Sequence, residues 1–576
     1  MVVRRMHQPS KRIRLVSAVI LLVGVLLIVR LYFVQVVHNS YYQERAQRQY
    51  VHTSQSIFDR GTIYFTTKDN VKVGAASMRA GFTLALNPEH VSDPALLYQS
   101  LAIYIPKVSA AEFIRKATLS ERTYVEIEPQ LSEEAAAAVE ALSLDGVMLY
   151  RTQWRYYPGY EVSARSLGFI GYTNDGTQLH GKYGLESSYD DVLFRDKSQQ
   201  SVNFFAEIFS NLGSLVFEQS ASKAGNVVTT IEPTVARMLD RILAETQLKY
   251  SSAQTGGIII NPKTGAIYAL NAVPTYNPND REGATIQEFR NPLVENVYEM
   301  GSIIKPLTIA AGLDSEVIIP ASTYYDPGFL ELNSFTIRNF DGKGRGTVDM
   351  QEVLNQSLNT GVAHVVKLMG HQQFRDYFLG LKLGSETGID LPSEAGGLVS
   401  NLESPREVEY ATASFGQGIA MTPIATVRAL SALGNGGHLI TPHLVSKIEY
   451  EDGTEKIIQY PDGAQVFTAQ TSETISRMLT NVVDDALRKG TVALPHHTIA
   501  AKTGTAQIAD KDGKGYFDDR FLHSFFGYFP AYDPQFLVFL YTVEPKGVKY
   551  ASETLTDPFM DLATFLINYY NVPPDR

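Results

Sequence analysis

An apolar run near the N-terminus constrains the topology of the chain more than any other feature. Leu15 to Val29 is uninterrupted and mostly aliphatic, and the run extends to Val37 with only Arg30 and Gln35 as polar interruptions. Such a run is long enough to cross a bilayer, for which about 20 residues are needed. Basic residues and no acidic ones precede it, so the positive-inside rule predicts a cytoplasmic tail over 1–14, a transmembrane helix over 15–37 and an exported remainder.

A cleaved signal peptide is the alternative for this run. It is long for such a peptide, and no small-residue cleavage site follows it. We therefore expect a single-pass protein of the cytoplasmic (inner) membrane, with its catalytic part on the periplasmic or extracellular side.

Length, charge and cysteine content limit the remaining classes. The chain has 576 residues, more than one hydrophobic core normally supports, so two or more domains are expected. It has no cysteine, which excludes a disulfide scaffold, a thiolate metal site and a cysteine nucleophile. Its formal charge is −11, and six of its 50 basic residues lie in the first 37 positions, so nucleic-acid binding is disfavoured.

The pattern of apolar residues predicts an α+β multidomain protein divided near residue 224. From 38 to 224 short strands alternate with helices, including a helix capped by Ser132 that would end near Gly146. Within this part, 165–173 is expected to form strands and 174–187 a glycine-rich loop. From 225 to 576 we expect a helix near 233–246, a hairpin over 256–272, strands within 497–509 and 523–543, and a final helix. These elements would form an antiparallel sheet flanked by helices, with a helical subdomain.

Three short motifs each occur twice in the chain. Their positions are S-x-x-K at Ser220 and Ser302, S-x-N at Ser201 and Ser357, and K-T-G at Lys263 and Lys502. In the first set Ser201 precedes Ser220, and Lys263 lies in the turn of the predicted hairpin. In the second set the motifs follow the expected order and leave room for a helical lobe, so this set is the candidate active site.

The residue types of the second set suit acyl transfer. Positions three apart on a helix share a face, so Lys305 can lie against the Ser302 hydroxyl. An ordinary lysine is protonated at neutral pH, but burial and a second cation, Lys502, would lower its pKa and make Lys305 a base. Ser302 also suits a helix N-cap, which is compatible with a nucleophilic role.

The other motif residues fit supporting roles in the same reaction. Ser357 would relay a proton to the leaving amine, and Asn359 would hold Lys305 and the substrate amide. Lys502, Thr503 and Thr505 on an edge strand would bind a terminal carboxylate, and Gly504 would allow close approach of the backbone. The backbone N–H groups of Ser302 and Thr505 would form an oxyanion hole.

The chain from Gly225 to Asn571 resembles the transpeptidase domain of class B penicillin-binding proteins. The resemblance is carried by "YEMGSIIKPLTIAAGL", "SLNTGVAHV", "SFGQGIAMTPI" and "AKTGTAQ". "FDRG", "RSLGFIGYT" and "YGLE" are similar to the pedestal (dimerisation-type) domain that precedes it in this family, so the resemblance covers nearly the whole chain. The anchor length, the modest pedestal and the late position of Ser302 resemble the division-specific members.

This resemblance implies a peptidoglycan D,D-transpeptidase that forms a Ser302 acyl-enzyme with stem peptides and releases D-alanine. Its implied partners are a D-Ala-D-Ala donor, an amine acceptor, β-lactams as covalent inhibitors, a polytopic membrane glycosyltransferase and other divisome proteins. It implies no cofactor and no metal. Ala501 and Leu358 depart from the usual family residues and are expected to narrow the cleft.

The same residues are compatible with three other functions. One is an elongation-type transpeptidase, a second is a D,D-carboxypeptidase or β-lactamase-like hydrolase, and a third is a non-catalytic β-lactam sensor or scaffold. Arg60, Arg165 and Glu186 are candidates for an interdomain ion-pair network, with ordinary surface positions as the alternative.

Overall fold

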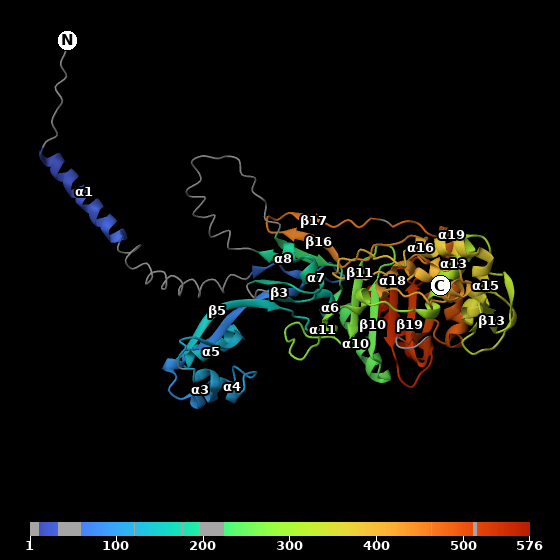
Figure 1. Ribbon diagram of the computed structural model, residues 1–576, viewed down its shortest axis with the longest axis horizontal. Helices are drawn as coiled ribbons and strands as arrows, with labels where there is room; N and C mark the ends of the chain where they lie inside the picture. The colour runs from blue at the N-terminus through green and yellow to red at the C-terminus, as the bar shows by residue number, and fades with distance from the viewer. Residues whose placement is uncertain are drawn as a thin grey trace, which may run out of the picture. The chain divides into compact units, whose positions relative to one another are not determined.

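The computed structural model describes residues 11–32, 59–119, 121–173, 178–195, 224–461, 463–510 and 515–576. The N-terminal helix α1 spans Lys11–Tyr32 (Figure 1). Within the described residues, no helix meets the combined length and hydropathy required to cross a membrane. Residues 33–37 of the predicted span lie outside the described residues, as do the motif serines Ser201 and Ser220.

The chain divides into two compact units, the first of which includes Arg79–Trp154. Its helices are α3 (Pro94–Leu101), α4 (Ala110–Ala117) and α5 (Glu133–Ala141). Its strands are β4 (Val125–Leu131), the part of β3 (Lys72–Leu86) from Arg79 on, and the part of β5 (Val147–Tyr156) up to Trp154. Strand β3 pairs with both β4 and β5, and the helices bury Leu97, Leu101, Phe113 and Val139 in a separate core. Ser132 caps α5 as predicted, but the helix ends at Ala141, earlier than expected.

The second unit includes Arg60–Met78, Arg155–Arg195 and Leu215–Arg576 and contains a five-stranded antiparallel sheet. The strand order is β11 (Ile267–Val273), β10 (Gln254–Ile260), β20 (Phe536–Val543), β19 (Tyr516–Phe529) and β18 (Ala500–Ala509). These strands lie side by side in Figure 1, where α10 (Pro233–Tyr250) lies beside β10. The predicted hairpin, the late strands, the helix near 233–246 and the final helix α21 (Thr556–Tyr570) are all confirmed.

A helical lobe lies in sequence between β11 and β18. Its main helices are α13 (Lys305–Asp314), α14 (Met350–Asn355), α15 (Asn359–Met369), α16 (His371–Gly380), α17 (Glu407–Ala413), α18 (Pro423–Ser431) and α19 (Ala469–Asn481). Between α13 and α14 the chain forms two short antiparallel pairs, β12 (Thr323–Asp326) with β15 (Gly346–Asp349) and β13 (Phe329–Leu332) with β14 (Phe335–Arg338). The lobe and the sheet share one continuous hydrophobic core.

The early segments of the second unit correct two sequence predictions. The stretch 165–173, expected to form a strand or a strand–turn piece, contains a strand, β6 (Ile170–Tyr172), but begins in a short helix, α6 (Ala164–Leu167). The predicted loop 174–187 contains β7 (Leu179–Gly181) and α7 (Gly184–Ser188). Tertiary hydrogen bonds account for α6, because Ser166 Oγ donates to the Leu270 carbonyl at 3.0 Å. Such long-range contacts override weak local propensity in short segments.

Further strands of this unit flank these segments. They are β1 (Asp59–Arg60), β2 (Ile63–Thr66), β8 (Phe194–Arg195), β9 (Gly225–Thr229), β16 (Val445–Tyr450) and β17 (Glu455–Ile457), with α8 (Asp190–Leu193) before β8. Strand β2 runs parallel to β9, and β9 pairs antiparallel with β16. The 38–224 segment therefore contributes strands to the unit that carries the sheet, and the boundary at residue 224 stays a prediction.

Glu186 is the centre of a buried ion cluster in the second unit. Its carboxylate accepts from Arg60 Nε and from Arg155 Nε, each at 2.6 Å, and from Tyr157 Oη at 3.2 Å. Burial alone raises the pKa of this carboxyl, but the charges of Arg155 and Arg60 outweigh it and hold the pKa below its usual value. Arg155 is thus a member of the cluster that the sequence did not reveal.

Arg165, grouped with Arg60 and Glu186 in the sequence, has different partners. Its guanidinium donates to backbone carbonyls, including Ala272 O at 3.2 Å and Arg290 O. It therefore ties α6 to β11 and to the segment after α11 (Ile286–Phe289). The interdomain role proposed for these residues stays a prediction.

Replacing Glu186 with Gln is expected to destabilise the second unit by about 3 to 5 kcal/mol, because the buried guanidinium groups of Arg155 and Arg60 lose this carboxylate partner. Arg60 keeps its ion pair with Asp190. Urea unfolding, followed by far-UV circular dichroism, measures the change in the free energy of unfolding. The matched control is Glu455→Gln, which breaks the exposed Lys447–Glu455 pair of 3.0 Å and should change stability by less than about 1 kcal/mol. Equal effects of the two substitutions would contradict the assignment.

Candidate active site

Ser302 and Lys305 lie at the two ends of one tight turn. The 3₁₀ turn η3 spans Gly301–Ile304, and Lys305 begins α13 directly after it. In a 3₁₀ turn residues i and i+3 eclipse, so both side chains leave the same edge. Ser302 is half-buried and Lys305 is fully buried. The predicted helix start at Ser302 is corrected to Lys305, and no serine side-chain cap is present at this helix.

Two glycines let this turn approach the edge strand β18. Gly301 has φ +66°, and a Cβ built there would lie 2.9 Å from the Thr505 carbonyl oxygen. A Cβ at Gly504 would lie 2.3 Å from Ser524 Oγ and 2.8 Å from the Met300 carbonyl oxygen. The S-x-x-K turn and the K-T-G strand are therefore in backbone contact, which places Ser302 next to Thr505.

The three motifs meet at the hydroxyl of Ser357. Lys305 Nζ donates to Ser357 Oγ at 3.1 Å and also to the Ser357 carbonyl, while Lys502 Nζ donates to the same Oγ at 3.1 Å. Ser357 lies between α14 and α15 with φ +53°, a left-handed conformation that is strained for a non-glycine residue. This conformation turns both oxygens of Ser357 toward Lys305.

Burial and mutual repulsion set the charge of the two lysines. Burial, and then the positive charge of Lys502, lower the pKa of the Lys305 amine well below its usual value. Burial also lowers the pKa of Lys502, to about 8. At neutral pH the arrangement therefore favours a neutral Lys305 beside a protonated Lys502, the direction expected from the sequence.

The remaining predicted residues are placed as follows. Lys502 to Thr505 lie on β18 at the edge of the sheet, Thr503 and Thr505 are half-buried, and Thr505 Oγ1 accepts from Ala551 N at 3.0 Å. Asn359 Nδ2 donates to the Arg338 carbonyl at 2.8 Å, whereas Lys305 Nζ donates to Ser357. The expected hold of Asn359 on Lys305 stays a prediction. Ala501 and Leu358 are both buried in the core.

Glu299, which sequence reasoning passed over, also borders the nucleophile turn. Its Oε1 accepts from Gly418 N and from Tyr516 Oη, each at 3.1 Å, and burial raises its pKa. Gly301 N donates to the Gly416 carbonyl at 3.1 Å, so the "SFGQG" segment braces the turn. Glu299 lies three residues before Ser302 in the "YEMGSIIK" stretch, and this position beside the motif was the one sequence feature that pointed to it.

Across the described ranges, no group of three or more histidine or carboxylate side chains is arranged to hold a metal ion. The arrangement instead offers a serine hydroxyl, a buried amine of lowered pKa, a second hydroxyl between two amines, and an edge strand. These groups suit nucleophilic acyl transfer.

Comparison with known protein families agrees with this geometry. Residues 255–562 match the penicillin-binding protein transpeptidase domain, and residues 59–229 match the penicillin-binding protein dimerisation domain. The first match covers more than half of the chain. The chain therefore belongs to the penicillin-binding protein transpeptidase family, and it is an enzyme of that family.

Individual relatives cover most of the chain. It is 30% identical to stage V sporulation protein D of Bacillus subtilis, over 85% of this chain and 76% of that protein. It is 24% identical to peptidoglycan D,D-transpeptidase FtsI of Escherichia coli K12, over 78% and 73%. The crystal structure of penicillin-binding protein 3 of Mycobacterium tuberculosis with aztreonam has the same fold, at 22% identity, a TM-score of 0.67 and coverage of 90% and 98%.

Replacing Lys502 with Met is expected to stabilise the protein at pH 7 by about 1 to 3 kcal/mol. The pKa of Lys502 falls from 10.5 in the unfolded chain to about 8 in the folded protein. Burying the protonated amine therefore costs stability below pH 8, and this cost is relieved as the pH rises from about 8 to 10.5. Loss of the bonds to Ser357 and Thr503 offsets part of the gain.

The measurement is the urea midpoint of the wild type and of Lys502→Met between pH 7 and 9.5. The advantage of the variant should shrink as the pH rises. A variant that is less stable at pH 7, or an advantage independent of pH, would contradict the charge assignment.

Proposed function

We propose that this chain is a peptidoglycan D,D-transpeptidase that cross-links stem peptides in septal cell-wall synthesis. The observation that carries the proposal is the Ser357 hydroxyl, which lies 3.1 Å from the amines of both Lys305 and Lys502. Membership of the transpeptidase family and the similarity to an enzyme named peptidoglycan D,D-transpeptidase support it.

In the proposed acylation step neutral Lys305 takes the proton of the Ser302 hydroxyl, and Ser302 Oγ attacks the carbonyl carbon of the penultimate D-alanine. The backbone N–H groups of Ser302 and Thr505 stabilise the oxyanion, each worth about 3 to 4 kcal/mol. The C–N bond then breaks, and the proton passes through Ser357 to the departing D-alanine amine. The product is an ester on Ser302.

In the second step an acceptor amine attacks the ester carbonyl and loses its proton to the same relay, which returns the hydroxyl to Ser302. Protonated Lys502 with Thr503 and Thr505 binds the terminal carboxylate of the donor, and Gly504 permits that approach. Asn359, held by the Arg338 carbonyl, faces the substrate amide. The chemistry of these side chains needs no cofactor or metal.

The same site accounts for trapping by β-lactams, whose strained amide mimics the donor. Structures of the Mycobacterium tuberculosis protein bear aztreonam and ampicillin in their names, which supports this extension. A hydrolase would use the same groups with water as acceptor; the dimerisation-domain match over 59–229 favours the transpeptidase.

For topology and domains we propose a tail at 1–14, a transmembrane helix at 15–37, a pedestal at 38–224 and a transpeptidase domain at 225–576. The apolar run, its basic flank and the family matches support these bounds. The catalytic part would lie outside the cytoplasm, where a polytopic glycosyltransferase and divisome proteins would contact the anchor and pedestal. A sporulation-stage role is the second candidate, since one relative is named for sporulation.

Ser302→Ala is expected to abolish covalent labelling by a fluorescent penicillin, because Ser302 Oγ supplies the attacking oxygen in the proposed mechanism. Denaturing gels measure the label. The matched control is Ser220→Ala at the other S-x-x-K motif, which should label as fully as the wild type. Undiminished labelling of Ser302→Ala would disprove the nucleophile assignment.

A fluorescent fusion of the full-length chain is expected to collect at midcell during division, as a septal role requires. Fluorescence microscopy of growing cells measures its placement, and a fusion without residues 1–37 should leave the membrane. Uniform sidewall placement would favour an elongation role, and signal confined to sporulating cells would favour the second candidate.

A further inference from the structure

The segment Thr323–Asp349, called here the insert, contains β12 to β15 and contacts the S-x-N motif. Its main hydrogen-bond acceptor is Asp326, whose carboxylate is buried. It accepts from Thr360 Oγ1 at 2.7 Å, from Asn339 Nδ2 at 2.9 Å, and from the backbone N–H groups of Gly328 and Arg345 at 2.9 and 3.0 Å. A buried charge needs such donors, so Asp326 fixes several chain segments at once.

One of these segments holds Asn359. Asn339 Oδ1 accepts from Thr360 N at 3.3 Å, and Asn339 N donates to the Gly328 carbonyl at 3.1 Å. The carbonyl of the same peptide unit belongs to Arg338 and accepts from Asn359 Nδ2 at 2.8 Å. The amide of Asn359 is thus bonded to a peptide plane that the Asp326 network holds.

Another segment holds the residue before Ser357. The backbone of Arg345 is bonded to Asp326, and Arg345 Nε donates to Gln356 Oε1 at 2.7 Å. The insert is therefore hydrogen-bonded to the motif on both sides of Ser357, at Gln356 and at Asn359. A residue in a strained left-handed conformation persists only where its surroundings enforce it.

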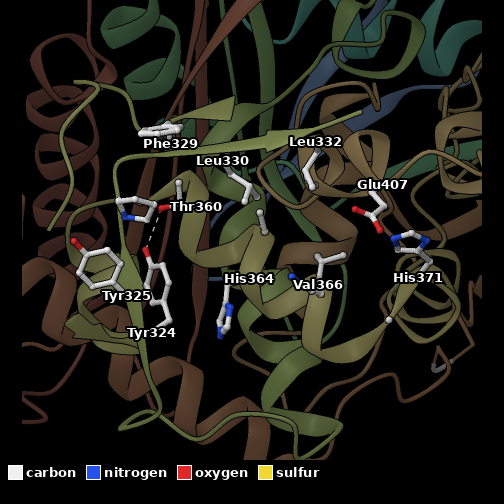
Figure 2. A pocket seen from close by; sticks show the side chains of 15 residues that line it. Tyr324, Tyr325, Phe329, Leu330, Leu332, Thr360, His364, Val366, His371 and Glu407 are labelled. Carbon is white, nitrogen blue, oxygen red and sulfur yellow. Dashed lines mark hydrogen bonds between the residues drawn. The ribbon is translucent and has the colours of Figure 1, made fainter. Parts of the chain in front are cut away.

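Hydrogen bonds add to the packing that holds this corner of α15. A cavity of about 400 Å³ lies against the helix. Figure 2 shows Thr360, His364 and Val366 of α15 and Tyr324 of β12 among the side chains that line it. The Tyr324 hydroxyl is hydrogen-bonded to Thr360 Oγ1 at 3.1 Å, as the dashed line marks. Thr360 is buried, and its hydrogen bonds to Asp326, Asn339 and Tyr324 tie the first turn of α15 to the insert.

We propose that the Asp326–Asn339–Thr360 network is the positioning element for Ser357 and Asn359 in acylation. This inference rests on the proposed function, because it assigns these three residues to the geometry of that reaction. None of them contacts the reacting atoms; each acts through the peptide planes that carry the relay hydroxyl and the substrate-facing amide.

The test measures the first-order acylation rate and the non-covalent dissociation constant separately, by stopped-flow with a fluorescent penicillin. Asp326→Asn keeps the shape but turns a donor toward the donors of Asn339 and Gly328. We expect the first-order rate to fall about 10- to 100-fold, the scale of a misplacement near 1 Å. The dissociation constant should change much less than the first-order rate, because the carboxylate-binding residues Lys502, Thr503 and Thr505 are untouched and only the contact of Asn359 with the ligand amide is altered.

Two matched pairs separate positioning from folding. Thr360→Val keeps the shape and removes the hydroxyl, so it should slow acylation, whereas Thr360→Ser should retain the rate. Glu331→Gln alters an exposed carboxylate of the same insert and should behave as wild type. Unfolding midpoints are measured in parallel, because a purely structural role would lower them and leave the first-order rate of folded protein unchanged.

Wild-type first-order rates in folded Asp326→Asn and Thr360→Val would overturn the inference and leave the proposed function standing. Equal slowing by Thr360→Ser and Thr360→Val would overturn it as well. If Ser302→Ala still takes the label, the proposed function fails instead. Slow but complete labelling of Ser302 in Asp326→Asn supports both.

Discussion

Two buried amines that share one hydroxyl define this site. Lys305 and Lys502 both donate to Ser357 Oγ, in surroundings that exclude water from Lys305 entirely. Two protonated lysines so close in a medium of low polarity repel strongly, so the arrangement is stable only when one amine gives up its proton. The difference in burial and neighbours assigns that loss to Lys305. A fold built for stability alone would not bring these groups together.

The architecture follows from the need to hold these groups across three chain segments. The sheet supplies Lys502 from its edge strand, and the lobe supplies Ser357 from an interhelical turn. The turn η3 supplies Ser302, and the first residue of α13 is Lys305. Each segment is anchored by contacts outside the site, such as Ser524 Oγ to the Met300 carbonyl at 2.8 Å and Asp326 to Thr360 at 2.7 Å. The shared core of lobe and sheet turns these separate anchors into one rigid frame.

The sequence predicted those parts that depend on order and periodicity. The helix Pro233–Tyr250 and the hairpin β10–β11 followed from spacing, and motif order predicted that Lys305, Ser357 and Lys502 belong to one site. That both amines donate to Ser357 Oγ is what the structure adds. Arg155, Glu299 and Asp326 could not be found that way, since each is a single charged residue outside the three short motifs and its partners are distant in the chain. The 3₁₀ turn at Ser302 was read as a helix because i, i+3 spacing suits both forms.

Gly301 and Gly504 let the turn that carries Ser302 and the strand that carries Lys502 approach each other closely through their backbones. A Cβ at either position would lie within 3 Å of backbone atoms or of Ser524 Oγ. Neither glycine can therefore be substituted without a shift of the segment that faces it. Substitutions that change the shape of the site are therefore expected at other positions around it. An inhibitor whose affinity depended only on this backbone contact would be weakened by few substitutions.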